Sequence, residues 1–337
     1  EALRTVEDQL RFTLALPPAA RRWKQLRGTV RELRGAVEKE RPPLALLRDT
    51  PGDPGHPDTS DHDPHRTDLR DLLAANAARA SQASRSIEEA LRMISPELAG
   101  RAERLRYALY EEEAAVVRLL APRQQLADAR LYALVTTALA AGPIVDVTAA
   151  AIAGGAQIIQ LREKELPARE FLALARDLRA VTAELGALLI INDRLDIAGL
   201  SEADGVHQGQ DDLRPADVRR ILGPDTIVGV STHSANQAAA AERDGADYIG
   251  VGPIFPTATK EHRAAVGLEY IQQAATATSL PGFAIGSVKL DNVHDVIAAG
   301  AQRIAVCTGI IAAADVEAAA RGFRSALDEA AENRANG

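Results

Sequence analysis

The chain is poor in cysteine, aromatic residues and long apolar runs, and each shortage excludes a class of protein. Its single cysteine, Cys307, excludes a disulfide within the chain and is typical of a reducing compartment such as the cytoplasm. Aromatic residues make up only 3% of the 337 residues, so the core must consist mainly of alanine, valine, isoleucine and leucine. No apolar run approaches the roughly 18 residues of a membrane span, and no signal-peptide pattern opens the chain. We therefore expect a cytoplasmic protein without a membrane partner.

Net positive charge is absent as well, since the formal net charge is −8. Nothing in this balance attracts nucleic acid, so an anionic substrate would need a local cluster of cations. Only five of the 39 basic residues are lysines, and two of these lie in the motifs Gln160–Lys164 (QLREK) and Gly252–Lys260 (GPIFPTATK). A compact ammonium group, rather than a planar guanidinium, is indicated at both places. The sequence therefore indicates an enzyme that handles a polyanion.

Residues 1 to about 120 have the pattern of an all-α domain, with apolar residues recurring every three or four positions. Arg4–Phe12 and Arg85–Met93 share the pattern R-x-[VI]-E-[DE]-x-L-R-[FM], and Lys24–Arg27 is similar to Glu103–Arg106. We interpret this as two related hairpins in a four-helix bundle; the alternative is chance similarity between two Arg/Glu-rich helices. The repeated charges could line a polar site or form a solvated helix face. They are Glu7, Asp8, Arg11, Glu88, Glu89 and Arg92.

Two segments are predicted to be connections. Residues 40–66 join the hairpins and are rich in proline, aspartate, histidine and glycine; the spacing of His56, His62 and His65 fits no ordered metal site, which favours a solvated loop. Residues 121–130 are expected to be a linker to the second domain. The only methionine is Met93, so we also expect residues upstream of Glu1.

From residue 131 to residue 337 short apolar runs alternate with alanine-rich helical stretches. Continuous apolar runs are typical of parallel strands buried on both faces. Eight such runs favour a (β/α)8 TIM barrel over an open doubly wound sheet, and no G-x-G-x-x-G follows the first run. The expected strands are Leu131–Thr136, Gln157–Arg162, Leu188–Asn192, Gly205–His207, Ile227–Ser231, Tyr248–Gly252, Gly282–Gly286 and Arg303–Cys307.

In such a barrel the active site lies at the carboxyl ends of the strands, where the motif residues fall. Arg162, Lys164 and Lys260 supply three cations, enough to hold a diphosphate. Asp193 and Asp212 follow neighbouring strands and could share Mg²⁺, which takes one or two carboxylates together with phosphate oxygens and water. Each aspartate alone could instead cap a turn or a helix. The combination favours a metal-assisted diphosphate site.

No nucleophile stands out, because the sequence has no Ser-His-Asp order and no pair of acid–base carboxylates. Cys307 lies in an apolar run and is most simply a small core residue. Ser231 could donate to a phosphate oxygen or close a turn, and His207 and His233 are expected to be structural. Backbone amides after strands seven and eight suit a second phosphorylated substrate. We therefore expect chemistry driven by stabilisation of a departing diphosphate.

These motifs resemble the thiamine phosphate synthase family over residues 131 to about 330, in that family's order and spacing. The resemblance implies a transferase that joins 4-amino-2-methyl-5-(diphosphooxymethyl)pyrimidine to a thiazole phosphate, giving thiamine phosphate and pyrophosphate; which thiazole tautomer is used stays open. It also implies that pyrophosphate leaves before the thiazole nitrogen attacks, because the ring amino group can feed electrons to the exocyclic methylene. The matching stretches are Gln160–Lys164, Ile191–Arg194, Gly205–Asp212, Gly229–His233, Gly250–Lys260 and Ala284–Gly286.

The resemblance assigns roles to individual residues. It implies that Asp193 and Asp212 bind Mg²⁺, and that Arg162, Lys164, Lys260 and Ser231 are catalytic. The residues implied for the pyrimidine diphosphate are Gln160, Leu161, Arg162, Glu163, Lys164, Asn192, Ser231 and Lys260; those for the thiazole phosphate are Thr257, Thr259, Gly286, Cys307 and Thr308. Two departures lie on the thiazole side. Ser287 stands where the family usually has glycine, and Thr308–Ile310 where it commonly reads Ser-Ala-Ile.

The helical half is similar to an N-terminal extension fused to this synthase in some bacteria, for which a pyrimidine phosphate kinase activity has been suggested. No P-loop or kinase signature is present, which favours a structural or dimerising role and leaves the kinase as the alternative. Rival interpretations of the barrel are a thiazole tautomerase, using a histidine near His233, and a non-catalytic sensor of phosphate ligands. The oligomeric state stays open.

Overall fold

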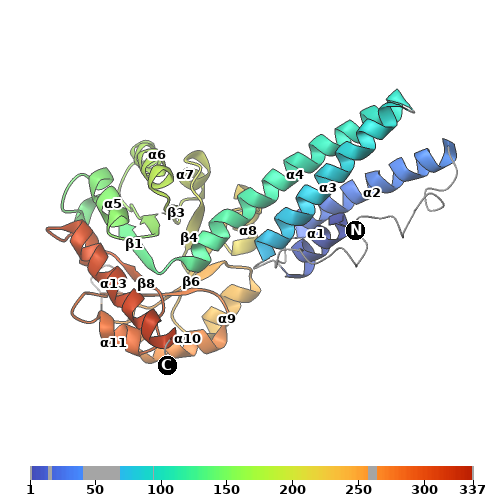
Figure 1. Cartoon of the computed structure of the whole chain (residues 1–337). Helices are drawn as coiled ribbons and strands as arrows, with labels where there is room; N and C mark the ends of the chain where they lie inside the picture. Colours follow the sequence, from blue (N-terminus) through green and yellow to red (C-terminus); the bar gives the residue numbers. More distant parts are fainter. Residues whose placement is uncertain (1, 14–16, 41–68, 94, 257–263, 336–337) are drawn as a thin grey trace. The chain divides into compact units, whose positions relative to one another are not determined.

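The chain folds into two compact units, residues 1–120 and 121–337, each with a core of its own (Figure 1). The computed structural model describes residues 2–13, 17–40, 69–93, 95–256 and 264–335. Apart from Glu40, the expected loop 40–66 lies outside the described residues. No helix among the described residues is both long and apolar enough to cross a membrane.

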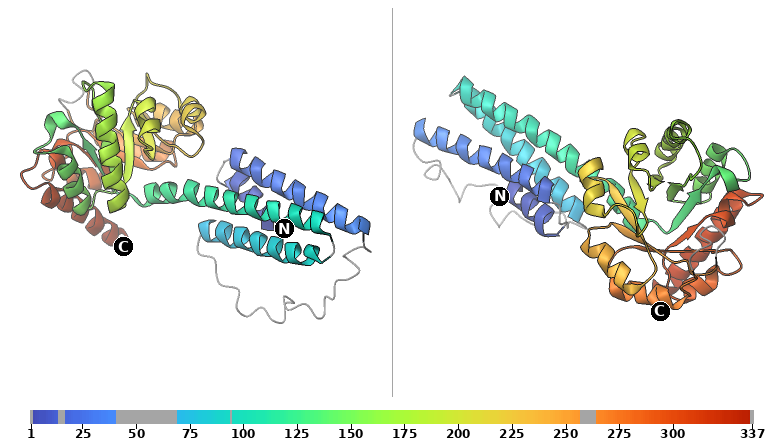
Figure 2. Two further views of the ribbon diagram at one scale, coloured as in Figure 1. Left: turned by 90° about the horizontal axis from the view of Figure 1, so that it is seen from above. Right: turned by 180° about the vertical axis from the view of Figure 1, so that it is seen from behind.

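The described residues of the first unit are helical, as predicted, apart from the short connection before Pro96. Its elements are α1 (Ala2–Asp8), a π-helical turn η1 (Gln9–Thr13), α2 (Pro17–Glu40), α3 (Leu69–Arg92) and α4 (Pro96–Asp128). Figure 2 shows α2, α3 and α4 lying side by side. Periodic apolar residues from all four α-helices meet in one core, in which Val6, Leu10 and Trp23 are fully buried.

The repeated sequence pattern corresponds to a repeated contact. Arg27 Nη2 lies 2.8 Å from Glu7 Oε2, and at the matching positions of the second copy Arg106 Nε donates to Glu88 Oε2 at 2.7 Å. Both glutamates are buried, with 4% and 1% of their surface exposed, so each carboxylate requires its partner. The equivalent pairs favour duplication of a hairpin over chance similarity. A solvated face fits Arg11, Glu89 and Arg92, which are exposed, and is wrong for the two glutamates.

Helix α4 continues to Asp128, so the expected linker at residues 121–130 is mostly helical even though it contains Pro122. The reason is burial: Leu126 and Ala129 pack into the apolar cluster inside the barrel. Arg123 also donates to Asp247 Oδ1 at 3.3 Å and to the carbonyl oxygen of Pro224 at 3.2 Å. This last turn of α4 therefore belongs structurally to the second unit.

The second unit is a closed barrel of eight parallel strands, in order β1 to β8, which confirms the predicted TIM barrel. The strands are β1 (Leu131–Val135), β2 (Ile158–Leu161), β3 (Leu188–Asn192), β4 (Gly205–Gln208), β5 (Ile227–Thr232), β6 (Tyr248–Val251), β7 (Gly282–Ile285) and β8 (Ile304–Val306). The helical segments after β1 are η4 (Thr137–Leu139), α5 (Ile144–Ala153), α6 (Ala168–Leu185), α7 (Leu195–Leu200), α8 (Pro215–Leu222), α9 (Ala235–Arg243), α10 (Glu269–Ala277), α11 (Val293–Ala298), α12 (Thr308–Ile311) and α13 (Val316–Ala335).

Side chains alternate between the barrel wall and its interior along each strand. In β2, Ile159 and Leu161 belong to the cluster that packs against the helices, whereas Ile158 belongs to the cluster inside the barrel. The same alternation sends Gln160 and Arg162 inward, and both line an interior cavity. The parity of each strand therefore decides which side chains can reach the carboxyl-end cavity.

Candidate active site at the carboxyl end of the barrel

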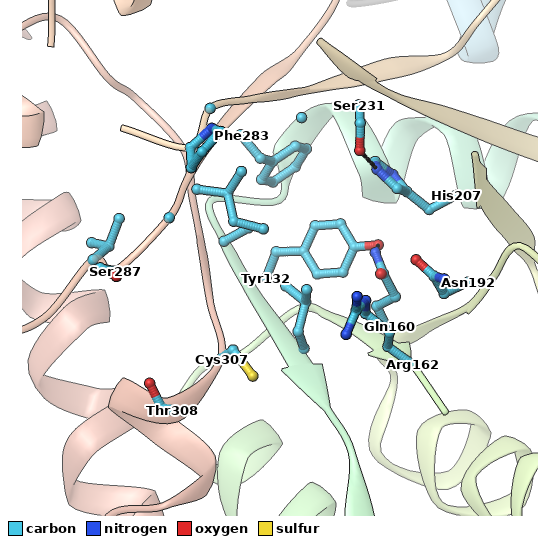
Figure 3. Close-up of a pocket in the computed structure, with 18 of the residues that line it drawn as sticks. Tyr132, Gln160, Arg162, Asn192, His207, Ser231, Phe283, Ser287, Cys307 and Thr308 are labelled. Carbon is cyan, nitrogen blue, oxygen red and sulfur yellow. Dashed lines mark hydrogen bonds between the residues drawn. The ribbon is translucent and has the colours of Figure 1, made fainter. Parts of the chain in front are cut away.

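A cavity of about 110 Å³ opens among the inward-facing residues at the carboxyl ends of the strands (Figure 3). It brings together side chains from β2, β3, β5 and the segments after β7 and β8, which are far apart in the sequence. The predicted site residues that line it are Gln160, Arg162, Asn192, Ser231, Gly286, Cys307 and Thr308.

Other predicted site residues lie elsewhere. Leu161 faces the opposite way, into the barrel wall, and is fully buried there. Glu163 accepts hydrogen bonds from the backbone N–H of Thr137 at 2.6 Å and from its hydroxyl at 3.1 Å, so its side chain fixes the loop after β1. Lys164, Asp193 and Asp212 are exposed. Thr257, Thr259 and Lys260 lie outside the described residues.

Asp193 and Asp212 lie close enough to affect each other's charge. Partial burial of its carboxyl group raises the pKa of Asp193, as do the charge of Asp212 and a hydrogen bond to it; the positive charges of Arg162 and Lys164 oppose the rise. Asp193 has a left-handed backbone with φ of +59°, which aspartate tolerates better than most residues. Asp212 Oδ2 accepts the backbone N–H of Gly209 at 2.6 Å. Two cations and two carboxylates thus meet at the rim.

The donor set fits a magnesium ion. Two like charges held side by side favour a bound cation, and Mg²⁺ characteristically takes only one or two carboxylates, with phosphate and water completing its shell. Among the described residues no group of three or more histidine, cysteine, aspartate or glutamate side chains could hold a metal by itself. At Asp193 and Asp212, water and substrate oxygens would complete the shell of such an ion.

The floor of the cavity is formed by aromatic residues that sequence reasoning missed. The chain has only five tyrosines and five phenylalanines, yet Tyr132, Tyr248 and Phe283 meet here. Phe283 stands edge-on to Tyr132 and Tyr248, with ring centroids 5.3 and 5.6 Å away. A Cβ atom on Gly229 would lie 2.0 Å from Tyr248 Cζ, so a side chain at that position would displace the ring. Inward parity on β1, β6 and β7 is the one sequence feature that could have identified these residues.

The two histidines near the site have different surroundings. His233 Nδ1 donates to the carbonyl oxygen of Gly252, and its backbone N–H donates to Gln237 Oε1 at 2.8 Å. The first bond fixes the ring and the second fixes the backbone. His207 lies between Tyr248 and Ser231, with Nδ1 3.1 Å from the Tyr248 hydroxyl and Nε2 2.9 Å from Ser231 Oγ. From the sequence His207 was expected to be structural; in the structure its ring lines the cavity.

The thiazole-side departures also have a structural setting. Gly286 has φ of +109°, and Ser287 follows with φ of +50°, a left-handed conformation that favours glycine. Ser287 Oγ donates to the carbonyl oxygen of Pro256 at 2.7 Å, which partly offsets the strain. Cys307 is half-buried, and burial raises the pKa of its thiol, so it is not activated as a nucleophile.

A closed parallel barrel with a cavity at its carboxyl end, and with cations gathered beside two carboxylates, defines a TIM-barrel enzyme for anionic substrates. The chain belongs to the thiamine monophosphate synthase family, whose model matches residues 131–310. A second model, described as the ThiD2 family, matches residues 1–115.

Several relatives carry the name thiamine-phosphate synthase. One from Gloeobacter violaceus is 43% identical over 315 residues, covering 94% of this chain and 89% of the relative. One from Moorella thermoacetica is 48% identical over 202 residues, covering 59% of this chain and 96% of the relative. Among solved structures, a thiamine phosphate pyrophosphorylase from Pyrococcus furiosus superimposes with a TM-score of 0.56 at 34% identity, covering 62% of this chain and 98% of that one.

The predicted family and activity are therefore confirmed: the chain is a transferase of thiamine biosynthesis. The Gloeobacter relative matches across both units, whereas the aligned region of the Moorella relative covers nearly all of that protein with 202 residues. Some relatives therefore contain a counterpart of the helical unit, whereas others are too short to contain both units.

Proposed function

We propose that the barrel joins the pyrimidine diphosphate to the thiazole phosphate by letting pyrophosphate depart before the new bond forms. The observation that carries the proposal is the meeting of Arg162 and Lys164 with Asp193 and Asp212 at one rim, where their charges influence each other. Such a cluster stabilises negative charge that develops on a leaving diphosphate. Among the described residues, the half-buried thiol of Cys307, whose pKa is raised by burial, is not the activated nucleophile that a covalent route would require.

The proposed reaction breaks one carbon–oxygen bond and forms one carbon–nitrogen bond. The bond between the exocyclic methylene carbon and the diphosphate oxygen breaks, and its electron pair leaves with the diphosphate. The ring amino group compensates the carbon for this loss, and the lone pair of the thiazole nitrogen then forms the carbon–nitrogen bond. Arg162 and Lys164 hold the departing anion, while the aromatic floor excludes water from the cationic intermediate.

Mg²⁺ would be held by Asp193 and Asp212, and when bound it neutralises charge on the diphosphate. Gln160, Asn192 and Ser231 would orient the pyrimidine diphosphate, since their side chains line the cavity. Gly286, Cys307 and Thr308 line the same cavity at the ends of β7 and β8, which suits the thiazole phosphate. Roles for Thr257, Thr259 and Lys260 rest on the sequence motif alone.

The test is to incubate the protein with both substrates and Mg²⁺ and to measure thiamine phosphate and pyrophosphate. Arg162→Ala should lower kcat/KM by roughly 100-fold, because an ion-pair donor to the leaving group is lost, whereas Arg176→Ala, on the outer face of α6, should not change it. Isomerisation of the thiazole without condensation would instead support a tautomerase. Binding of both substrates without turnover would support a sensor.

For the helical unit a second activity is proposed, phosphorylation of the pyrimidine monophosphate to give the diphosphate that the barrel consumes. The match of residues 1–115 to the ThiD2 family supports it, together with the two buried Glu–Arg pairs, since buried ion pairs are expensive to maintain for structure alone. Consumption of ATP that depends on the pyrimidine monophosphate, and is lost in Glu88→Gln, is the expected result. No turnover in the full chain would leave a structural or dimerising role.

A further inference from the structure

A continuous series of hydrogen bonds crosses the barrel from Gln160 to Ser231. Gln160 Nε2 donates to the Tyr132 hydroxyl at 2.6 Å, and the Tyr132 and Tyr248 hydroxyl oxygens are 2.9 Å apart. Tyr248 reaches His207 Nδ1 at 3.1 Å, and His207 Nε2 reaches Ser231 Oγ at 2.9 Å. Figure 3 shows the Gln160 amide at the Tyr132 hydroxyl and the His207 ring at Ser231.

We propose that Tyr132, Tyr248 and His207 are positioning residues, which fix the direction of this hydrogen-bond series so that Ser231 must donate its own proton to the ligand. The proposal deepens the proposed function, on which it rests for the identity of that ligand as the diphosphate.

The direction follows from counting protons. Gln160 donates into Tyr132, so the single Tyr132 proton goes to Tyr248, its other contact. Tyr248 then gives its proton to His207 Nδ1. A neutral imidazole that accepts at Nδ1 carries its proton on Nε2, and this proton is donated to Ser231 Oγ. The serine oxygen is then an acceptor within the series, and its own proton is left for the ligand.

With the Gln160 amide in this orientation, the opposite direction is unfavourable. Tyr132 would then accept from both Gln160 and Tyr248, and its own proton would have no acceptor in the part of the chain that the structure describes, although the residue is only 2% exposed. A buried donor without an acceptor costs stability. Burial also raises the pKa of both tyrosines, so neither becomes an acceptor by losing its proton.

The series also links two ends of the pyrimidine substrate. When Gln160 Nε2 donates to Tyr132, Gln160 Oε1 remains an acceptor and suits the ring amino group, which is a donor. A pyrimidine with an oxygen in place of that amino group would turn the amide around and reverse the series. Ser231 would then donate to His207 and not to the diphosphate. Recognition of the amino group by Gln160 and binding of the leaving diphosphate by Ser231 are therefore coupled.

The fixed tautomer also separates Ser231 from a nucleophile. A serine activated for attack needs a base that accepts its proton. Here His207 Nε2 already carries a proton, so the Ser–His contact serves binding and not covalent catalysis.

The first test is nitrogen NMR of the full chain labelled with ¹⁵N-histidine, without substrates, since the two neutral tautomers have different ring-nitrogen shifts. His207, assigned by its loss in His207→Gln, is expected to be protonated on Nε2. Tyr248→Phe should release this preference, whereas Tyr270→Phe should leave it unchanged, because the Tyr270 hydroxyl contacts Thr232 Oγ1 and the Ser234 carbonyl outside the series. Protonation on Nδ1, or a mixture in the wild-type protein, would overturn the proposal. This measurement does not depend on turnover. A wrong tautomer can therefore be distinguished from a failure of the proposed function.

The second test is a double-mutant cycle on kcat/KM. Tyr248→Phe should lower kcat/KM about tenfold in the wild-type background but less than about twofold in Ser231→Ala, because it acts only through the Ser231 proton. Tyr270→Phe should leave kcat/KM unchanged. An equal loss from Tyr248→Phe in both backgrounds would mean that the tyrosine merely supports the fold, and the proposal would be wrong.

Discussion

At Asp193, the stability of the fold and the proposed metal-binding role oppose each other. Its carboxylate is placed beside Asp212 and is partly shielded from water, and both effects raise its pKa. A group with a raised carboxyl pKa binds protons more strongly in the folded state than in the unfolded one. The folded state therefore loses stability as the pH rises from the unfolded pKa, about 3.9, through the folded pKa. At neutral pH without Mg²⁺ the full cost is present.

Asp193→Asn is therefore expected to raise the melting temperature near pH 7 without Mg²⁺ and to abolish most of the activity. The gain should be below about 1 kcal/mol, because the residue is exposed and solvent screens the repulsion, and asparagine also tolerates the left-handed backbone. The control is Asp196→Asn, three positions along. The pKa of Asp196 is lowered by its bonds to Arg194, so that variant should be slightly destabilised. Calorimetry at pH 4 and pH 7 measures both; a fall in melting temperature for Asp193→Asn would contradict the repulsion.

For individual residues, the polar part of the cavity lining could largely be named from the sequence, whereas its aromatic part could not. Gln160, Arg162 and Ser231 were found because their residue types carry chemistry and follow apolar runs. Tyr132 and Tyr248 were missed because a tyrosine inside a buried strand looks like core, and only the closed barrel makes their hydroxyl groups meet. Leu161 was included through its motif, although strand parity turns its side chain away.

Among the secondary-structure elements, the helical hairpins contain equivalent buried Glu–Arg pairs. In the second copy, Glu88 accepts from Arg106 on α4 and from Arg92 on its own helix. The Arg106 side chain is 15% exposed and that of Arg92 is 55% exposed, so the two arginines contribute unequally. Hydrogen bonding to Arg106 is the main cause that lowers the pKa of Glu88.

Arg106→Ala should lower the melting temperature of the helical unit clearly more than Arg92→Ala, because it leaves a buried carboxylate without its shielded partner. Arg27→Ala should behave like Arg106→Ala if the two pairs are equivalent. A carboxyl group with a lowered pKa stabilises the fold above its unfolded pKa, about 4.3, and this contribution disappears as the pH falls through the folded pKa. Far-ultraviolet circular dichroism during heating follows the unit. Equal effects of Arg106→Ala and Arg92→Ala would contradict this view of the pair.

Element boundaries could be predicted where the chain alternates simply between apolar and polar runs. Strand β3 was predicted without error, and each of the other seven strands within one residue at each end, because buried parallel strands are continuous apolar runs. The end of α4 could not be predicted. Pro122 and its polar neighbours look like a linker, and only the buried contacts of Leu126 explain why the helix continues.

For the whole molecule, separate apolar cores in the two units predict that each unit can fold by itself. The barrel core includes Leu126 and Ala129, which precede β1, and Asp247 binds Arg123 from the same segment. The natural boundary for cutting the chain is therefore before residue 121 and not at the first strand.

A fragment of residues 121–337 is expected to fold and to keep synthase activity with kcat/KM within about threefold of the full chain, because all described cavity residues lie within it. A fragment of residues 131–337 should be markedly less stable, since it loses the buried contacts of Leu126 and Ala129. Activity assays and thermal melts of both fragments check this. An inactive but folded 121–337 fragment would show that the helical unit takes part in the synthase reaction.

The alternation of side chains along each strand determines which mutations in the gene can be tolerated. Point changes at wall positions such as Ile159 can exchange one apolar residue for another without touching the chemistry, so the two sets of positions are free to diverge separately. Deletion of a single codon inside β2 has a different effect, because it shifts the alternation of the strand by one residue. The apolar side chains would then face the cavity, and Gln160 or Arg162 would face the packed wall. The strand would lose both its packing against the helices and its contribution to the cavity.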